Sequence, residues 1–112
     1  MMSFLFQSPE TDLLEAIRKR LIPLGFSEAK DDTYPFLNFT RGDLLVRWIK
    51  DPRTQSYGMC IYAGTKTFQR PDGTNVELPK LSQQTSCPLS NKKLKESSPQ
   101  ILEMLDRWIL TL

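Results

Sequence analysis

Two hydrophobic periods divide this chain. Near the N-terminus, Leu13, Leu14, Ile17 and Leu21 recur at the spacing of one helical face, and a second helical stripe occupies the last residues of the chain. Between these stripes apolar and polar residues alternate in short runs, which is typical of strands with two different faces. The pattern therefore predicts an α+β protein in which helices flank an antiparallel sheet.

The first helix is predicted over residues 9–22. Ser8 precedes Pro9, so a hydroxyl can cap the first turn while proline occupies a position that needs no N–H. Acidic residues stand in the first turn and basic residues in the last, which matches the helix dipole. Pro23 and Gly25 then end the helix.

The sheet is predicted as an antiparallel meander of about four strands, assembled from runs at about 34–40, 43–50, 56–63, 66–69 and 75–78. Gly42 marks a tight turn before residue 43, and Pro71-Asp72-Gly73 marks the turn of a second, smaller hairpin. Phe26 begins the sheet region, where a short strand before the polar residues 30–33 stays an open alternative. The resulting fold is a two-layer α+β domain with both helices packed on one face.

Residues 80–97 are rich in Ser, Gln, Lys and Asn, and they are predicted as a long surface connection with one helical turn near Leu94. Ser98-Pro99 repeats the helix-start signature of Ser8-Pro9. The C-terminal helix is therefore predicted over residues 99–111, with a broad apolar stripe that packs on the sheet.

The central hairpin, residues 43–63, carries apolar side chains on both faces. Leu44, Val46 and Trp48 alternate toward one face and make a core row. Two helices cover only one face, so the other face is expected to meet a partner protein or a second copy of the chain. The predicted partner-binding residues on and beside that face are Leu45, Arg47, Ile49, Arg53, Tyr57 and Tyr62.

Length and composition fit one soluble domain spanning residues 1–112. The chain has 39% hydrophobic residues and a net charge of +2, which is too small to indicate a dedicated phosphate-binding surface. No stretch reaches transmembrane length, and the N-terminal residues lack a basic region and an extended apolar core of a secretory signal. We therefore expect a cytoplasmic protein in which Cys60 and Cys87 are reduced thiols.

The sequence contains no histidine, which removes the usual triads and most zinc sites. It also lacks a CxxC pair, a GxGxxG motif and a Walker loop, so no catalytic residue, cofactor or metal is predicted. A carboxylate-only or lysine-based enzyme stays a weaker alternative. The tripeptide Arg41-Gly42-Asp43 matches an adhesion motif, but a hairpin turn explains its glycine.

Non-catalytic protein binding is the favoured function, because Tyr, Trp and Arg dominate interface hot spots. A small domain that binds single-stranded nucleic acid is the other alternative, since strands with basic and aromatic residues resemble stacking platforms. The near-neutral charge and the absence of glycine-aromatic motifs argue against nucleic acid as the partner.

The layout of the chain resembles a loose group of small bacterial proteins. The order is helix, meander, long connection and helix, with the run Leu21-Ile22-Pro23-Leu24-Gly25-Phe26 after the first helix and a Leu-Val-Arg-Trp strand. This organisation is similar to small bacterial proteins of unknown function, including immunity proteins of polymorphic toxin systems, and more faintly to secretion chaperones. The resemblance implies an accessory or toxin-neutralising role and carries over no functional residue.

Overall fold

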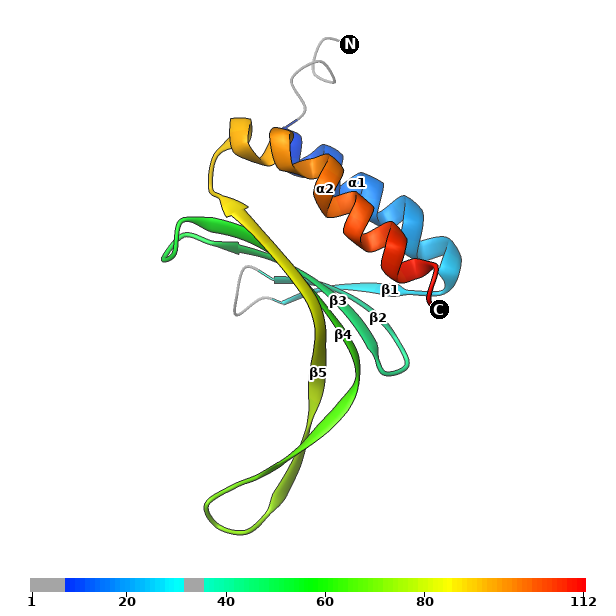
Figure 1. Ribbon diagram of the computed structural model, residues 1–112, viewed down its shortest axis with the longest axis vertical. Helices are drawn as coiled ribbons and strands as arrows, with labels where there is room; N and C mark the ends of the chain where they lie inside the picture. Colours follow the sequence, from blue (N-terminus) through cyan, green and yellow to red (C-terminus); the bar gives the residue numbers. More distant parts are fainter. Residues whose placement is uncertain (1–7, 32–35) are drawn as a thin grey trace.

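A five-stranded antiparallel sheet lies beneath two helices that run side by side in the same direction (Figure 1). The computed structural model describes residues 8–31 and 36–112, and the sheet order in these ranges is β1-β2-β3-β4-β5. The elements, in chain order, are α1 (Pro9–Leu21), the 3-10 helix η2 (Ile22–Leu24), β1 (Ser27–Asp31), β2 (Phe36–Arg41), β3 (Leu44–Asp51), β4 (Ser56–Gln69), β5 (Asn75–Pro88) and α2 (Asn91–Ile109). The predicted two-layer α+β meander with both helices on one face is confirmed.

Helix α1 begins and ends where its sequence indicates. The Ser8 hydroxyl accepts a hydrogen bond from the Thr11 N–H at 3.1 Å, and Pro9 occupies the first turn. After η2 the chain turns at Gly25, whose φ of 93° is open to glycine at little cost. Leu13, Ile17 and Leu21 are buried against the sheet, so one stripe of α1 contributes to the core.

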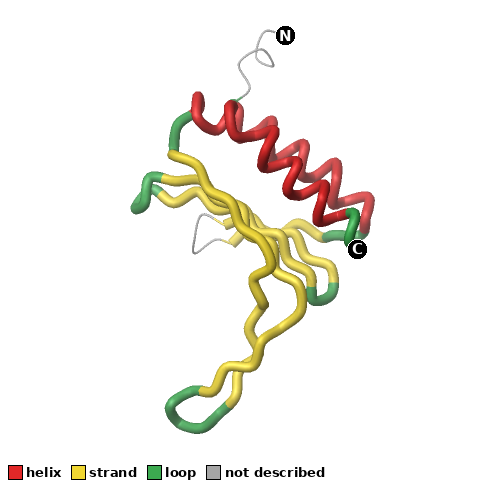
Figure 2. Tube along the Cα trace, viewed as in Figure 1, coloured by secondary structure: helices red, strands yellow, loops and turns green. Residues whose placement is uncertain are grey.

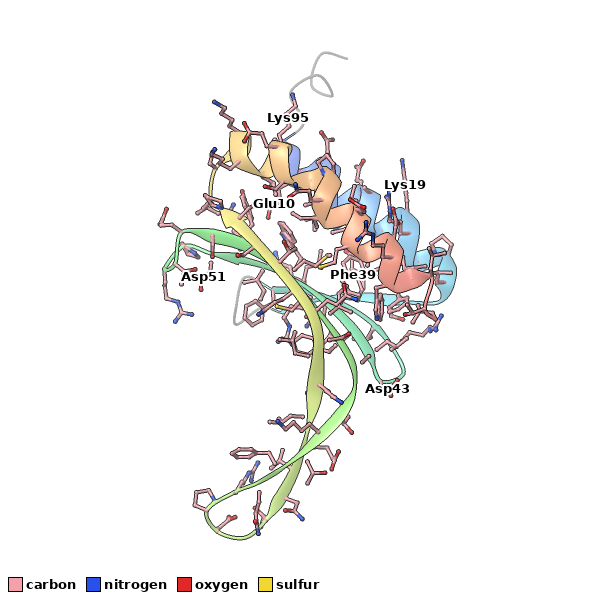
Figure 3. The ribbon with its side chains drawn as sticks, viewed as in Figure 1. Glu10, Lys19, Phe39, Asp43, Asp51 and Lys95 are labelled. Carbon is pink, nitrogen blue, oxygen red and sulfur yellow. The ribbon has the colours of Figure 1, made fainter. Side chains whose placement is uncertain are left out.

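The core lies between the helices and one face of the sheet, which we call the inner face. Its strand residues include Phe39, Val46, Trp48, Met59 and Ile61, and Figure 3 shows Phe39 directed toward the helix layer. The helix residues that meet them are Leu13, Ile17, Leu21, Leu94, Ile101, Leu105 and Trp108. Trp48 stacks on Tyr57 with ring centroids 5.5 Å apart, which adds aromatic packing to the area buried.

Two features of the sheet correct the sequence-based prediction. Residues 27–31 form a full edge strand, β1, which pairs with β2 from Ser27 opposite Thr40 to Asp31 opposite Phe36. The predicted separate strands 56–63 and 66–69 are one strand, β4, which continues through a bulge near Gly64 and forms one long hairpin with β5. Residues 34–35 of the predicted strand 34–40 lie outside the described residues.

The segment 80–97 is not a surface connection. Residues up to Pro88 extend β5, whose polar side chains gave no strand signal but whose backbone pairs with β4. Helix α2 then begins at Asn91, where the Ser90 hydroxyl accepts from the Lys93 N–H at 3.3 Å. The prediction of a helix start at Ser98-Pro99 is therefore wrong, although the turn near Leu94 is indeed helical.

Pro99 lies inside α2 because packing outweighs its local cost. Proline removes one helical hydrogen bond and crowds the preceding turn. Leu94 on one side of Pro99 is fully buried, and Ile101 and Leu105 on the other side are buried on the same stripe. Since both halves pack on the inner face, the helix continues through the proline. The Ser98 hydroxyl also donates to the Leu94 carbonyl at 2.7 Å.

The burial of Leu94 provides a test of this corrected segment. Leu94→Ala should lower the free energy of unfolding by about 2–5 kcal/mol, because it leaves a cavity in a packed core. Lys92 lies on the exposed side of the same turn, so the matched variant Lys92→Ala should change the free energy of unfolding by about 0.5 kcal/mol or less. Urea denaturation of both variants gives the measurement. Equal effects would show that residues 91–98 are not packed against the sheet.

Candidate interaction surface

The sheet face opposite the helices, the outer face, carries a cluster of aromatic, aliphatic and polar residues. Among the described residues no helix covers this face (Figure 1). The pairing register places Asn38 opposite Arg47, Arg47 opposite Cys60, and Leu45 opposite Tyr62. We define the outer-face patch as Phe36, Asn38, Leu45, Arg47, Ile49, Cys60, Tyr62 and Leu81.

Arg47 is the centre of the patch and is held by three neighbours. Its guanidinium carbon lies 5.0 Å from the ring centroid of Phe36 and 5.8 Å from that of Tyr62. Its Nε–H donates to the Asn38 Oδ1 at 2.9 Å. A cation between two ring faces is stabilised by both, each contact contributing about 0.5–1 kcal/mol at an exposed site. The arginine head is thus fixed in position before any partner arrives.

Tyr62 keeps its proton over the physiological pH range. Partial burial raises the pKa of its hydroxyl above the ordinary value, and the neighbouring Cys60 thiol raises it further, while Arg47 opposes the change. The hydroxyl therefore remains neutral and can donate a hydrogen bond. Together, the patch offers a fixed cation, a phenolic hydroxyl and an amide, surrounded by half-buried aliphatic side chains.

Most of the predicted partner-binding residues meet on this face, with one correction. Leu45, Arg47, Ile49 and Tyr62 share the outer face and are half-buried. Tyr57 is instead only 5% exposed and belongs to the inner-face core, so its expected exposure to a partner is wrong. It alternates with Met59 and Ile61, which both point inward, and this spacing could have placed it correctly.

Arg53 lies apart from the patch, in the turn between β3 and β4. Its backbone N–H and its Nε both point to the Asp51 carboxylate, at 2.9 and 3.4 Å. The hydrogen bond from the Arg53 backbone N–H is the main reason that the pKa of Asp51 lies below its usual range, so this carboxylate stays ionised. Figure 3 shows Asp51 and Asp43 at opposite ends of the hairpin, which places this turn far from the β2–β3 turn.

Sequence reasoning missed four members of the patch: Phe36, Asn38, Cys60 and Leu81. Phe36 and Asn38 could have been found from the Gly42 turn, because that hairpin register sets Asn38 directly across from Arg47. Leu81 could not, since it lies in the segment that gave no strand signal, yet it pairs with Tyr62 and is 45% exposed.

The distal half of the β4–β5 hairpin forms an arm of residues 65–79 that extends beyond the sheet and away from the helices (Figure 2). Register shifts around Tyr62 mark a bulge, and Gly64 there adopts a φ of 75°. Bulges increase strand twist and bend the ladder, which accounts for the departure of the arm from the sheet. Phe68 and Leu78 in the arm are 55% and 47% exposed.

The opposite side of the arm is polar and internally bonded. The Thr65 and Thr67 hydroxyls both donate to the Glu77 carboxylate, at 2.7 and 2.5 Å. These two hydrogen bonds lower the pKa of Glu77 below its usual range, and the bond from Thr67 has the larger effect. The arm is therefore a two-sided ribbon with Phe68, Val76 and Leu78 on one side and this polar network on the other.

Arg41 of the Arg-Gly-Asp tripeptide has contacts within the body of the domain. Its guanidinium donates to the Leu24 carbonyl at 2.9 Å and lies 5.2 Å from the Phe26 ring centroid. Gly42 has a φ of 59°, as the β2–β3 turn requires. The tripeptide therefore has a structural explanation in the link between this turn and the end of η2.

The described part of the chain contains no group of three or more Cys, Asp or Glu residues arranged to hold a metal ion. None of its helices is long and apolar enough to cross a membrane. No protein-family model matches the chain, and neither the curated proteins nor the solved structures that were compared with it give a match.

Cys60 and Cys87 should differ in reactivity because they lie on opposite faces of the sheet. Cys87 is 7% exposed on the inner face, where burial raises the pKa of its thiol and keeps it protonated. Iodoacetamide should therefore alkylate Cys60 well before Cys87 in the folded protein, as mass spectrometry of the peptides would show. Both should react alike in denaturant. A Cys60–Cys87 disulfide formed without unfolding would contradict this arrangement.

The Glu77 network predicts a local pH response in the arm. A lowered pKa in the folded state means that the contribution to stability is present above the ordinary pKa and is lost as pH falls through the lowered value. Thr67→Val removes one donor and should raise the pKa of Glu77 toward its ordinary value, measured by NMR titration. The pKa of Asp72, held low by Thr74 in the nearby turn, provides the internal control. An unchanged pKa of Glu77 in Thr67→Val would show that the network does not persist in solution.

Proposed function

We propose that this protein is a non-catalytic protein-binding module that contacts its partner through the outer-face patch. The observation that carries the proposal is the Arg47 guanidinium fixed between the rings of Phe36 and Tyr62 on a sheet face without a helix. An arginine whose position is already fixed loses little side-chain entropy on binding. Arginine and tyrosine are also the residues that most often contribute strongly to protein interfaces.

The partner surface should combine an acidic group with apolar side chains. Asn38 accepts a hydrogen bond only from Nε of Arg47, so the terminal N–H groups of the guanidinium can donate to a carboxylate of the partner at two points. Leu45 and Ile49 on either side of Arg47 offer aliphatic surface. Phe68 and Leu78 in the arm offer additional apolar surface, which would increase the area buried against the partner.

The same geometry favours protein over single-stranded nucleic acid. Stacking platforms leave aromatic faces open to bases. Here the ring faces of Phe36 and Tyr62 are turned toward Arg47, and Arg47 is the one cation of the outer-face patch. A toxin-neutralising or other accessory role fits such a binding surface, since it requires tight contact and no turnover.

The test uses charge reversal at Arg47. Immobilised protein should capture a partner from lysate of the native host, and Arg47→Glu should reduce the recovered partner at least tenfold by quantitative mass spectrometry. The matched control is Arg107→Glu on the exposed side of α2, which changes charge by the same amount and should leave capture unchanged. Titration of the purified partner should then show a Kd at least tenfold higher for Arg47→Glu.

Three results would contradict the proposal. One is equal capture by the wild type and by Arg47→Glu. Another is recovery of nucleic acid in place of protein, with binding that weakens steeply as salt rises. The last is a collapse of the melting temperature in Arg47→Glu, because that would assign the residue to folding and not to recognition. Circular dichroism melting of both variants is therefore measured alongside capture.

A further inference from the structure

A groove of about 430 Å³ lies between α1 and the inner face at the β1 side of the sheet. Its two long walls come from regular elements. Glu10, Leu14 and Arg18 follow one another at intervals of four along α1, so they lie on one face of the helix. Below them, Lys30, Leu37 and Trp48 pair across β1, β2 and β3 and form one row of the inner face.

Ion pairs close both ends of the groove. At one end Glu10 accepts from the Trp48 indole N–H at 3.0 Å and lies 3.7 Å from the Lys50 Nζ, and Figure 3 shows Glu10 between the helices and the sheet. At the other end Arg18 donates twice to the Glu28 carboxylate, at 2.6 and 3.1 Å. These contacts fix the distance between α1 and the sheet, and the half-buried Leu14 and Leu37 leave the space between them open.

The charges that remain available in the groove are positive. Both carboxylates are engaged: Glu28 by Arg18, and Glu10 by Trp48 and Lys50. Arg18 donates two of its five N–H groups to Glu28. Among the described residues the Lys30 side chain has no ion-pair or hydrogen-bond partner, and the contact of Lys50 to Glu10 is long. An occupant should therefore bring a negative group to Lys30 and an apolar body to Leu14, Leu37 and the edge of Trp48.

We propose that this groove binds a small organic anion with a flat or compact apolar body. Its volume lies within the range of small-molecule sites, about 300–1,000 Å³. Its lining combines an apolar floor of Leu14, Phe36, Leu37 and Trp48 with five charged residues. The groove lies on the helix side of the sheet and shares only Phe36 with the outer-face patch, and the proposal does not rest on the proposed protein partner.

The probe is 2-naphthoate, a flat apolar ring system that carries one carboxylate. Its binding is followed by NMR through the two indole N–H signals of the protein. The Trp48 signal should shift saturably, since this N–H lies at the end of the groove, while that of Trp108, packed on Phe26 away from the groove, should not. Acetate, which lacks the apolar body, and 2-naphthylmethanol, which lacks the charge, should each bind at least tenfold more weakly.

Lys30→Glu should raise the Kd for 2-naphthoate at least tenfold without changing the fold, because Lys30 is exposed on an edge strand. Lys66→Glu, which makes the same charge change on the exposed arm, should leave the Kd unchanged. The proposal is overturned if Trp48 does not shift at millimolar 2-naphthoate. It is also overturned if Trp48 and Trp108 shift together, or if Lys30→Glu binds as well as the wild type.

Discussion

The burial of the inner sheet face beneath two parallel helices determines which strand side chains point toward the core and which point to the outer face. Val46, Trp48, Met59 and Ile61 are buried there and alternate with residues that must then point the other way. A slip of one residue between any two strands would exchange the faces, moving Arg47 into the core and Val46 out of it. The free energy of core burial therefore determines the outer-face patch, although no patch residue belongs to the core.

Local sequence signals predicted the parts of the fold in which pattern and packing agree. The Ser8-Pro9 cap, the stripe of α1 and the alternation of β3 all appear in the structure as expected. The prediction of a surface connection over residues 80–97 failed because the structure of these residues depends on contacts with distant parts of the chain. β5 is a polar edge strand that exists through pairing with β4, and α2 passes through Pro99 because Leu94 is buried by residues far away in the chain.

The same distinction applies to the candidate site. Alternation along β3 and β4 identified Leu45, Arg47, Ile49 and Tyr62, because a strand with one buried face has a defined opposite face. It could not identify the contacts that hold Arg47, which come from Phe36 and Asn38 on the neighbouring strand. Leu81 depended on the register beyond a bulge, which side-chain patterns do not encode.

Phe36 connects the two surfaces of this protein. Its ring lies against Arg47 in the outer-face patch, and it also lines the groove beneath α1. An occupant of the groove would thus contact a residue that helps to hold Arg47 in place. Phe36 is the first described residue of β2, so the outer-face patch and the groove meet at this end of the strand.

Site-specific photo-crosslinking in the native host tests whether the outer-face patch contacts a partner protein. A photoreactive amino acid at position 62 places the reactive group in the outer-face patch, and the same amino acid at position 19 places it on the exposed side of α1, where Figure 3 shows Lys19 pointing away from the sheet. We expect a defined protein adduct from position 62 and none from position 19. An adduct from position 19 alone, or from neither position, would contradict this expectation.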